Sequence, residues 1–360
     1  ITQYFWPENF RINDFCKGLV EKGHEIEVLT SVPNYPEGKF YNGYHNRFKT
    51  ENWENIKINR CPVIARGSSK LTLFLNYISF MLIASIRVIF IRKVDLVLAM
   101  SYSPVISVIP SFFIKSSKKI IWVQDLWPES LKATNTINNA LIINFINKLV
   151  SFIYKRFDKI LIQSKSFKNY IIINQKIDEK KISYLPNHFE DLFDNNNLPN
   201  KPNQLKYIKT PIILFAGNIG YAQNLSMTLK VDKILRNKDV EVSWVFLGNG
   251  RYFSEFENQI KTENKQNFFL LGNFPLEKMN SFYHHSDLLF VSLNDEPIFS
   301  YTIPNKVQSY LASGKPILAS LSGAGKKIIN DSGAGFASDA NLSNEVAKNI
   351  ISFLDLNNDN

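Results

Sequence analysis

The sequence predicts an α/β fold of two doubly wound domains whose parallel sheets face each other across a cleft. Apolar strand-like runs alternate with helical stretches along the chain, which is typical of parallel sheets with right-handed crossovers. The 360 residues exceed what one hydrophobic core usually supports. A polar stretch with prolines at 195–211 separates the halves, so we expect domains at 1–200 and 201–360.

The elements follow in order along each half. In the first half we expect strands at 25–30, 95–100, 119–124 and 158–163, with helices that include 10–22, 70–93 and 140–156. In the second half we expect strands at 211–217, 241–248, 268–272, 287–293 and 316–320, again with helices between them. The opening ITQYF resembles the end of a strand and the tail LDLNNDN stops just after a helix, so we expect a chain truncated at both ends.

Charge is distributed unevenly. Residues 1–200 hold 26 Lys or Arg against 17 Asp or Glu, while residues 201–360 hold 16 against 15. A basic first half indicates an anionic partner such as phosphate groups or an acidic membrane surface. The basic residues are scattered and form no recognition helix, so we expect no nucleic-acid partner.

Two features bear on the compartment. Cys16 and Cys61 form no CxxC pair, which fits a reducing cytosol. The stretch 71–86 is uncharged but shorter than the roughly 20 apolar residues of a spanning helix. It is either a buried crossover helix or a helix resting on a bilayer interface, with the following arginines on anionic headgroups.

Glycine and polar residues follow the predicted strands of the second half, where ligands of open α/β sheets bind. Such residues let backbone amides approach a ligand closely. Each glycine taken alone also fits an ordinary turn. The candidates are Gly217, Asn218, Gly220, Gly248, Gly250, Asn273 and Phe274, the last of which would border a base.

Lys306 stands in the first turn of a short helix that Pro304 and Asn305 begin. A helix N-terminus already carries about half a positive charge, so a cation there is unfavourable unless an anion arrives. Lys306 beside glycine loops therefore suits a diphosphate. An ordinary solvated surface lysine is the competing interpretation.

Several nucleotide and metal motifs are absent from the sequence. It has no GxxxxGK[ST] loop, GNGRYF does not complete GxGxxG, and no DxD pair is available to hold a metal. The five histidines show no metal-ligand spacing. We therefore expect no metal and no cofactor, with lysine and helix dipoles neutralising the diphosphate.

The stretch WVQDLWPES at 122–130 carries the main candidates of the first half. Asp125 follows a strand, and Trp127 and Glu129 occur where a loop would contact a sugar. A helix cap or an ordinary loop acid is the alternative for these acids. Further polar residues at neighbouring strand ends complete an expected rim: Glu8, Arg11, Asn34 and Tyr35.

These motifs together resemble the retaining glycosyltransferases of family 4, and within them the subgroup that builds bacterial O-antigen, capsule and exopolysaccharide. Within this subgroup, the chain resembles N-acetyl-L-fucosamine transferases of O-antigen assembly. The resemblance rests on QYFWPENFR, VPNYPEGK, WVQDLWPESL, FAGNIGYAQNL, GNFPLEKM and the stretch TIPNKVQSYLASGKPILA, in this order from Thr2 to about Gly335.

The resemblance implies a GT-B fold of two Rossmann-like domains, a UDP-sugar held by the second domain and a sugar acceptor held by the first. Acceptors in this subgroup are usually sugars on undecaprenyl diphosphate, so we expect a cytoplasmic enzyme peripheral to the inner face of the membrane. Lys306 would stabilise charge on the leaving diphosphate. We assign Asp125 and Lys306 as catalytic.

The chain also departs from the common family pattern. Many members carry a glutamate pair where this chain has Tyr301 and Ser309, and an Arg and a Lys where it has Asn218 and Gln223. We expect these four residues to contact the donor in a different way. A UDP-sugar epimerase and a non-catalytic sugar-nucleotide-binding protein remain alternatives.

Overall fold

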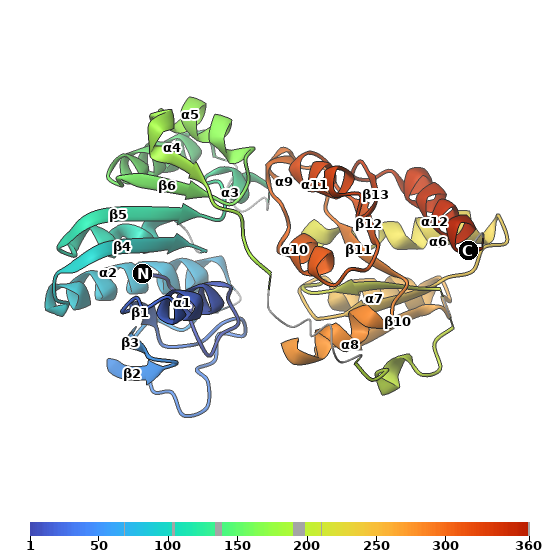
Figure 1. Cartoon of the computed structure of the whole chain (residues 1–360), viewed down its shortest axis with the longest axis horizontal. Helices are drawn as coiled ribbons and strands as arrows, with labels where there is room; N and C mark the ends of the chain where they lie inside the picture. The colour runs from blue at the N-terminus through green and yellow to red at the C-terminus, as the bar shows by residue number, and fades with distance from the viewer. Residues whose placement is uncertain (68, 103–104, 134–138, 190–198, 210, 359–360) are drawn as a thin grey trace. The chain divides into compact units, whose positions relative to one another are not determined.

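The computed structural model describes residues 1–67, 69–102, 105–133, 139–189, 199–209 and 211–358. The chain divides into two compact units, Ile1–Asn187 and His188–Asn360, which are described separately (Figure 1). Both units pack helices against sheets of mainly parallel strands, so the predicted α/β fold class is confirmed. Residues 195–198 and 210 of the predicted junction lie outside the described residues.

The first unit contains two sheets, of strand order β1-β3-β2 and β4-β5-β6-β7. Its strands are β1 (Glu27–Ser31), β2 (Lys49–Trp53), β3 (Ile56–Cys61), β4 (Val94–Ser101), β5 (Ser116–Val123), β6 (Lys159–Ile162) and β7 (Ile182–Tyr184). Its helices are α1 (Ile12–Glu21), α2 (Lys70–Arg87), η1 (Val88–Phe90), η2 (Val105–Phe113), α3 (Glu129–Ala133), α4 (Ala140–Lys155), α5 (Phe167–Gln175) and η3 (Glu179–Lys181).

The first three residues join these two sheets. The Thr2 N–H donates to the Leu29 carbonyl at 3.1 Å, and the Ser31 N–H donates to the Gln3 carbonyl at 3.2 Å. On the other side, the Met100 N–H donates to the Ile1 carbonyl at 2.8 Å. The extended segment therefore lies between β1 and β4, as the strand-like reading of ITQYF predicts.

The hairpin of β2 and β3 is a feature that the sequence analysis missed. β2 pairs antiparallel with β3, while β3 pairs parallel with β1. Glu54 and Asn55 form the two-residue turn with φ of 51° and 60°, the left-handed conformations that such turns need. β2 is mostly exposed, so its sequence lacks the apolar run that marks the other strands.

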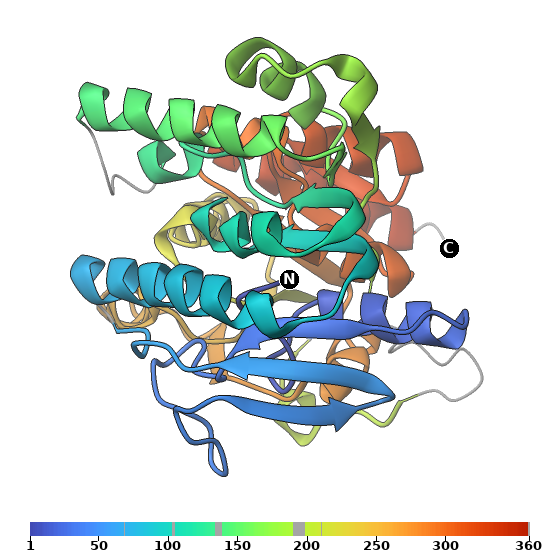
Figure 2. The ribbon, with the colours of Figure 1, turned by 90° about the vertical axis from the view of Figure 1, so that its left-hand side faces the viewer.

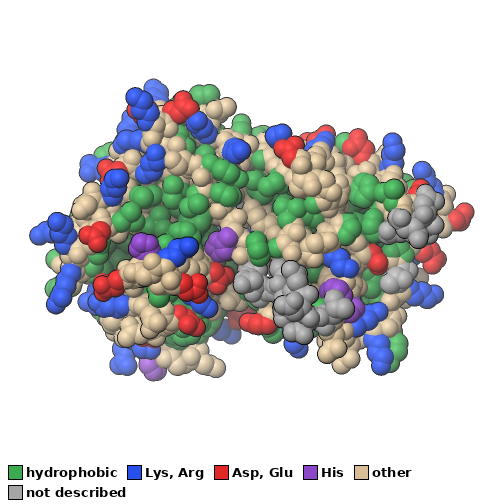
Figure 3. All heavy atoms as spheres, in the orientation of Figure 1, with side chains coloured by type: hydrophobic (Ala, Val, Ile, Leu, Met, Phe, Trp, Pro, Cys, Tyr) green, Lys and Arg blue, Asp and Glu red, His purple; other side chains and the backbone are tan. Residues whose placement is uncertain are grey.

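Helices cover both faces of the first unit. Ile12 and Cys16 of α1 pack with Val28, Ile58 and Met100 on one face. On the other face, Phe80 and Ala84 of α2 pack with Leu29 and Val97. Figure 2 shows α2, η2 and α4 as neighbouring helices, and Figure 3 shows hydrophobic side chains gathered over this unit with Lys and Arg around its outer edge.

The second unit has one six-stranded parallel sheet of order β10-β9-β8-β11-β12-β13. Its strands are β8 (Ile212–Ala216), β9 (Ser243–Leu247), β10 (Phe268–Gly272), β11 (Leu288–Ser292), β12 (Ile317–Ser320) and β13 (Gly335–Ser338). Its helices are η4 (Asn203–Leu205), η5 (Tyr221–Gln223), α6 (Met227–Arg236), α7 (Phe253–Thr262), η6 (Leu276–Lys278), α8 (Met279–His284), α9 (Pro297–Tyr301), α10 (Asn305–Ala312), α11 (Ala324–Ser332) and α12 (Ser343–Asn358).

The central strand β8 packs against helices on both faces of the sheet. Ile213 and Phe215 pack into a core with α6, α7 and α12. Ile212 and Leu214 pack into a second core with α8, α10 and α11. An uninterrupted apolar run of this kind is typical of a parallel strand covered by helices on both sides.

Candidate functional site

The strand order of the second unit places a topological switch point between β8 and β11. Numbered along the sheet, the order is 3-2-1-4-5-6, so the chain leaves these two neighbouring strands in opposite directions. Ligands of such sheets bind beyond the carboxyl ends of the strands at this point. We call residues 217–225 after β8 and 293–296 after β11 the switch-point loops.

Hydrogen bonds hold the switch-point loops together. The Asn294 N–H donates to the Ala222 carbonyl, and its side-chain amide donates to the Tyr221 carbonyl, both at 2.8 Å. The Ser292 hydroxyl donates to the Gln223 carbonyl at 2.5 Å. The loops are therefore preorganised by contacts within the unit itself.

The glycines at these strand ends are required by close backbone contact. A Cβ on Gly248 would lie 1.9 Å from the Gly217 carbonyl oxygen, and one on Gly250 would lie 2.2 Å from that of Ile219. The Gly248 N–H donates to the Gly272 carbonyl at 2.7 Å. Part of the glycine pattern is thus explained by packing between loops.

Lys306 lies against the end of β8. Its Nζ atom is 4.6 Å from the centroid of the Phe215 ring, and a Cβ on Gly217 would lie 2.8 Å from that atom. Burial lowers the pKa of Lys306 to about 8. Within the described part of the chain, no ion pair or hydrogen bond engages this ammonium group.

Helix α10 holds Lys306 in this position. Pro304 precedes its first residue, Asn305. The Ala216 N–H donates to the Tyr310 hydroxyl at 3.0 Å, which ties α10 to the end of β8. The structure therefore brings Lys306 beside Gly217, as a diphosphate site would need, while Pro304 and Asn305 start the helix that carries it.

The other predicted donor residues have varied surroundings. Gln223 accepts a hydrogen bond from the Gly220 N–H at 3.1 Å, and Asn218 lies beside Gly220 and Gly250. Phe274 packs on Phe282 with centroids 4.7 Å apart. Asn273 is exposed, Tyr301 ends α9, and the Ser309 hydroxyl donates to the Asn305 carbonyl at 3.5 Å.

Glu8 and Asn34 organise the strand-end loops of the first unit. The buried Glu8 carboxylate accepts the N–H groups of Asn34 at 2.8 Å, Tyr35 at 2.7 Å and Phe5 at 3.3 Å. Burial raises the pKa of Glu8 to about 7, although these three donors favour its ionised form. Its oxygens are thus engaged by backbone, which gives this predicted rim residue a structural role.

Arg66 is a candidate that sequence reasoning missed. Its guanidinium group lies 5.0 Å from the Tyr35 ring centroid and donates to the Tyr4 hydroxyl at 2.9 Å. Its backbone N–H donates to the Asn34 side chain at 2.9 Å. Because Arg66 follows β3, recognising that strand would have pointed to it. The buried Arg11 opens α1 in the same region.

Asp125 follows β5 and is partly buried. Burial raises its pKa to about 6. Tyr154 lies close enough for the Asp125 charge to raise the pKa of its hydroxyl, after the larger effect of burial. Trp127 has a buried indole N–H, which finds no acceptor among the described residues.

Glu129 begins α3 and is already engaged. Its Oε1 atom accepts a hydrogen bond from the Tyr170 hydroxyl at 2.8 Å and pairs with Lys132 at 2.9 Å. Glu8 is held by backbone N–H groups of the loops around Asn34, whereas Asp125 lies near Tyr154. The predicted acceptor residues therefore belong to distinct local clusters.

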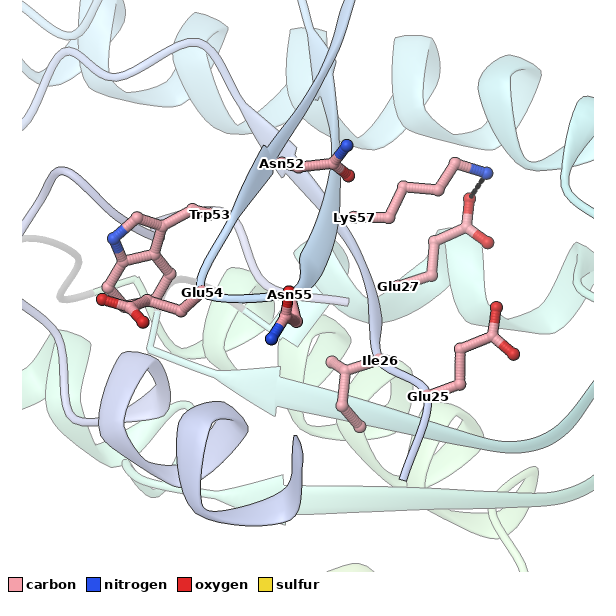
Figure 4. A pocket seen from close by; sticks show the side chains of 8 residues that line it. All are labelled: Glu25, Ile26, Glu27, Asn52, Trp53, Glu54, Asn55 and Lys57. Carbon is pink, nitrogen blue, oxygen red and sulfur yellow. Dashed lines mark ion pairs between the residues drawn. The ribbon is translucent and has the colours of Figure 1, made fainter. Parts of the chain in front are cut away.

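A hollow of about 500 Å³ lies elsewhere in the first unit (Figure 4). Glu25 and Glu27 at the start of β1 line it together with Trp53 and Lys57 of the hairpin, and Lys57 pairs with Glu27 at 2.9 Å. It lies at the amino ends of β1 and β3, opposite to where ligands of parallel sheets bind. None of the predicted site residues lines it.

The described residues contain no cluster of side chains that could bind a metal ion. No three His, Cys, Asp or Glu side chains there converge in a way that would hold an ion. The cationic group at the switch point is an ammonium, which attracts anions directly. The arrangement can therefore stabilise negative charge beside Gly217.

Two family profiles match the chain. Residues 10–190 match the one described as Glycosyltransferase Family 4, and residues 197–360 match the one described as Glycosyl transferases group 1. The first match covers half of the chain. A search of curated proteins finds no match.

Solved structures resemble the chain in fold. WaaG, a glycosyltransferase involved in lipopolysaccharide biosynthesis, is 11% identical with a TM-score of 0.68, and the match covers 99% of this chain and 89% of WaaG. HepE from Anabaena in complex with UDP is 12% identical with a TM-score of 0.62, covering 98% of this chain and 88% of HepE. HepE has also been crystallised with UDP and glucose.

A third similar structure is TarM from S. aureus, crystallised with UDP among other ligands. It is 14% identical with a TM-score of 0.51, and the match covers 72% of this chain. This chain spans only 48% of the TarM chain. At these identities the likeness concerns the fold, and the fold is GT-B.

Proposed function

The chain belongs to Glycosyltransferase Family 4, and on that premise we propose that it transfers a hexosaminyl or hexosyl group, with retention, from a UDP-sugar to a lipid-linked sugar. The acceptor carrier is undecaprenyl diphosphate. The product is a bacterial surface polysaccharide of the O-antigen, capsule or exopolysaccharide type.

One observation carries the choice of donor. Lys306 lies at the start of α10, with its ammonium group over Phe215 and beside Gly217. Negative charge develops on a nucleoside diphosphate as the bond to the sugar breaks. A fixed ammonium at that position stabilises the transition state more than the ground state, because the negative charge it faces grows as the bond breaks.

The lowered pKa of Lys306 fits an anionic ligand. Burial costs an ammonium group its hydration, which is why the pKa falls to about 8. An arriving diphosphate supplies the opposite charge and favours the protonated form. The free site is therefore short of a counter-charge that the proposed donor provides.

Structures of similar fold support a uridine nucleotide. HepE was crystallised with UDP and with glucose, and TarM with UDP. WaaG acts in lipopolysaccharide biosynthesis. These proteins motivate a UDP-sugar donor and a surface-polysaccharide product for this chain.

We assign the acceptor side to the first unit. Asp125 follows β5 with a pKa raised to about 6, so it is mostly ionised near neutral pH. A carboxylate there accepts a hydrogen bond from a sugar hydroxyl, and Trp127 offers an aromatic face to a sugar ring. We further propose that the enzyme works in the cytoplasm at the inner face of the membrane, because a lipid-linked acceptor resides there.

The central test measures UDP release from UDP-sugars in the presence of lipid extracts. We expect Lys306→Met to lower kcat by roughly 10²–10³-fold, the usual cost of removing one group that stabilises developing charge. Lys230→Met, which removes an exposed lysine of α6, is the matched control and should behave as wild type. EDTA should leave the rate unchanged.

Three results would contradict the proposal. If the rate depended on added divalent metal, the metal ion rather than Lys306 would be the main source of charge stabilisation. Conversion of UDP-sugar alone into an isomer would indicate an epimerase. Binding of UDP without any UDP release would indicate a non-catalytic sugar-nucleotide-binding protein, which the residues Tyr301 and Ser309 at the usual glutamate positions would then explain.

A further inference from the structure

Helix α2 has its polar side chains turned toward the protein. The Asn76 side chain accepts from Gln3 at 2.8 Å and donates to the Ile64 carbonyl at 2.7 Å. Ser79 accepts from the Ile64 N–H at 3.0 Å. Arg87 donates to Thr50 and Asn59 at 3.2 and 3.1 Å.

The opposite face of α2 and η1 is apolar and open to solvent. Its members are Leu71, Phe74, Leu82, Ile86, Ile89 and Phe90, each 54–73% exposed. Their spacing follows the helical period, so they form one continuous stripe. A surface helix of a protein in water normally shows the reverse arrangement.

The apolar stripe continues onto neighbouring helices. η2 packs between α2 and α4, and its Phe113 is 58% exposed. Leu141, Phe145 and Phe152 of α4 are 51–80% exposed at positions that share a helix face. We call these exposed side chains of α2, η1, η2 and α4 the apolar face, and Figure 2 shows the helices that carry it lying side by side.

The apolar face is not a membrane span in this fold. Residues 70–90 are long and apolar enough to cross a bilayer, and 22% of that window is buried. However, Phe80, Ala84 and Val88 pack against Leu29 and Val97 of the sheets. The helix is thereby held along the side of the unit, where only its outward stripe can enter lipid.

The segment that carries the apolar face is rich in basic residues. Residues 70–156, which include all of it, hold 11 Lys or Arg and 3 Asp or Glu, so they account for eight of the net charge of +10. Arg92 and Lys93 are exposed directly after η1, and Lys148 and Arg156 are exposed on and after α4. An apolar stripe with a basic border is complementary to the acyl chains and anionic headgroups of a bilayer.

We propose that the apolar face docks this protein on an anionic lipid bilayer, with the helices lying in the plane of the interface. The proposal deepens the proposed function, since it names the surface by which the enzyme reaches a lipid-linked acceptor. It rests on the first unit alone. A second copy of the chain is a poorer occupant, because a two-fold contact would bring the same basic residues together.

The test is co-sedimentation of the full chain with vesicles of phosphatidylcholine mixed with phosphatidylglycerol. Phe74→Gln/Ile86→Gln replaces two side chains that are each 57% exposed, so the fold should survive. We expect binding to weaken by about tenfold or more, because two apolar side chains no longer enter lipid. Leu356→Gln, also 57% exposed but in α12 of the second unit, is the matched control and should bind as wild type.

A second variant tests the charged border. Arg92→Gln/Lys93→Gln should weaken binding by about fivefold per residue removed. Vesicles of phosphatidylcholine alone should bind the wild type more weakly, and added salt should reduce the difference between the two vesicle types. A wild type that binds both vesicle types equally would overturn the anionic part of the proposal.

Two further outcomes would overturn the docking surface. One is vesicle binding by Phe74→Gln/Ile86→Gln that equals that of the wild type. The other is a wild type that is dimeric by analytical ultracentrifugation, binds no vesicles and becomes monomeric in the double variant. Thermal unfolding of each variant with and without UDP separates the docking surface from the proposed donor. If UDP stabilises none of the variants while vesicle binding follows the expected pattern, the proposed donor is wrong and the docking surface stands.

Discussion

At the residue scale, two ionisable side chains matter most for the proposed reaction, and burial shifts the pKa of both. Lys306 has a pKa of about 8 and Asp125 a pKa of about 6. Each shift has desolvation as its main cause, which disfavours the charged form of a buried group. Lys306 is charged below its pKa and Asp125 above its pKa, so both carry charge together only between about pH 6 and 8.

The pH dependence of kcat/KM follows from these two pKa values. We expect a bell-shaped profile that rises through about pH 6 as Asp125 ionises and falls through about pH 8 as Lys306 loses its proton. Initial rates with a UDP-sugar across this range measure it. Asp125→Asn should remove the acid limb, and Lys306→Arg should move the alkaline limb to higher pH. An acid limb that persists in Asp125→Asn, or an alkaline limb that stays in place in Lys306→Arg, would show that another group titrates.

Glu8 illustrates a residue whose sequence-level role and surroundings differ. An acid just after the strand-like opening ITQYF suggests a polar rim, yet its carboxylate accepts hydrogen bonds from three backbone N–H groups of two loops. Those donors come from Phe5, Asn34 and Tyr35, and their convergence depends on the fold of the whole unit. An acceptor-binding role for Glu8 stays a prediction.

At the scale of elements, the junction of β8 and α10 controls the site. The Gly217 backbone has a φ of 135°, and the Lys306 side chain occupies the space where a Cβ would be. Tyr310 fixes α10 to Ala216 by a hydrogen bond. The position of the ammonium group therefore depends on a glycine at the end of one strand and on the docking of the following helix.

Gly217→Ala tests this junction. The new Cβ would lie 2.5 Å from Lys306 Cε, so we expect the lysine to be displaced and kcat to fall about tenfold or more. The positive φ should also lower the free energy of unfolding by about 1–3 kcal/mol. Gly18→Ala in α1, where a Cβ meets nothing within 4 Å, is the control and should keep full activity; an active Gly217→Ala variant would show that the close contact is dispensable.

The strands also show why some elements could not be predicted from sequence patterns. All nine predicted strands are present, because each is an apolar run with clear ends. β2 is mostly exposed and its turn lacks glycine, so neither of the usual hairpin signals marks it. Missing β2 and β3 concealed Arg66, whose position beside Asn34 and Tyr35 only becomes visible once β3 is known.

At the scale of the whole molecule, the two units have separate cores, and we assign donor binding and membrane docking to different units. The second unit holds the switch-point loops and Lys306, whereas the first holds Asp125 and the apolar face. Their charge differs as well, since residues 1–187 hold 26 Lys or Arg against 14 Asp or Glu, and residues 188–360 hold 16 against 18. Donor and membrane are therefore assigned to different units.

Hydrogen exchange with UDP tests this division. We expect UDP to protect amides of 217–225 and 305–310, by up to about 2.7 kcal/mol at a concentration 100 times Kd. Amides of the first unit around Glu8 and Asn34 should change little. Protection confined to the first unit would contradict the assignment, and Lys306→Met should reduce the effect in the second.

The sequence by itself determined the α/β class, five of the six described strands of the second unit, and the closeness of Lys306 to a glycine loop, while β13 was missed. It could do so because parallel strands covered on both faces are continuous apolar runs, and because ligands of such sheets bind at their carboxyl ends. Only the tertiary structure decided that Glu8 is held by backbone donors, that Arg66 adjoins Tyr35, and that the outward face of α2 is its apolar one. Those facts depend on which side of an element meets the core, and a helix whose polar residues point inward has the same periodicity as one whose polar residues point outward.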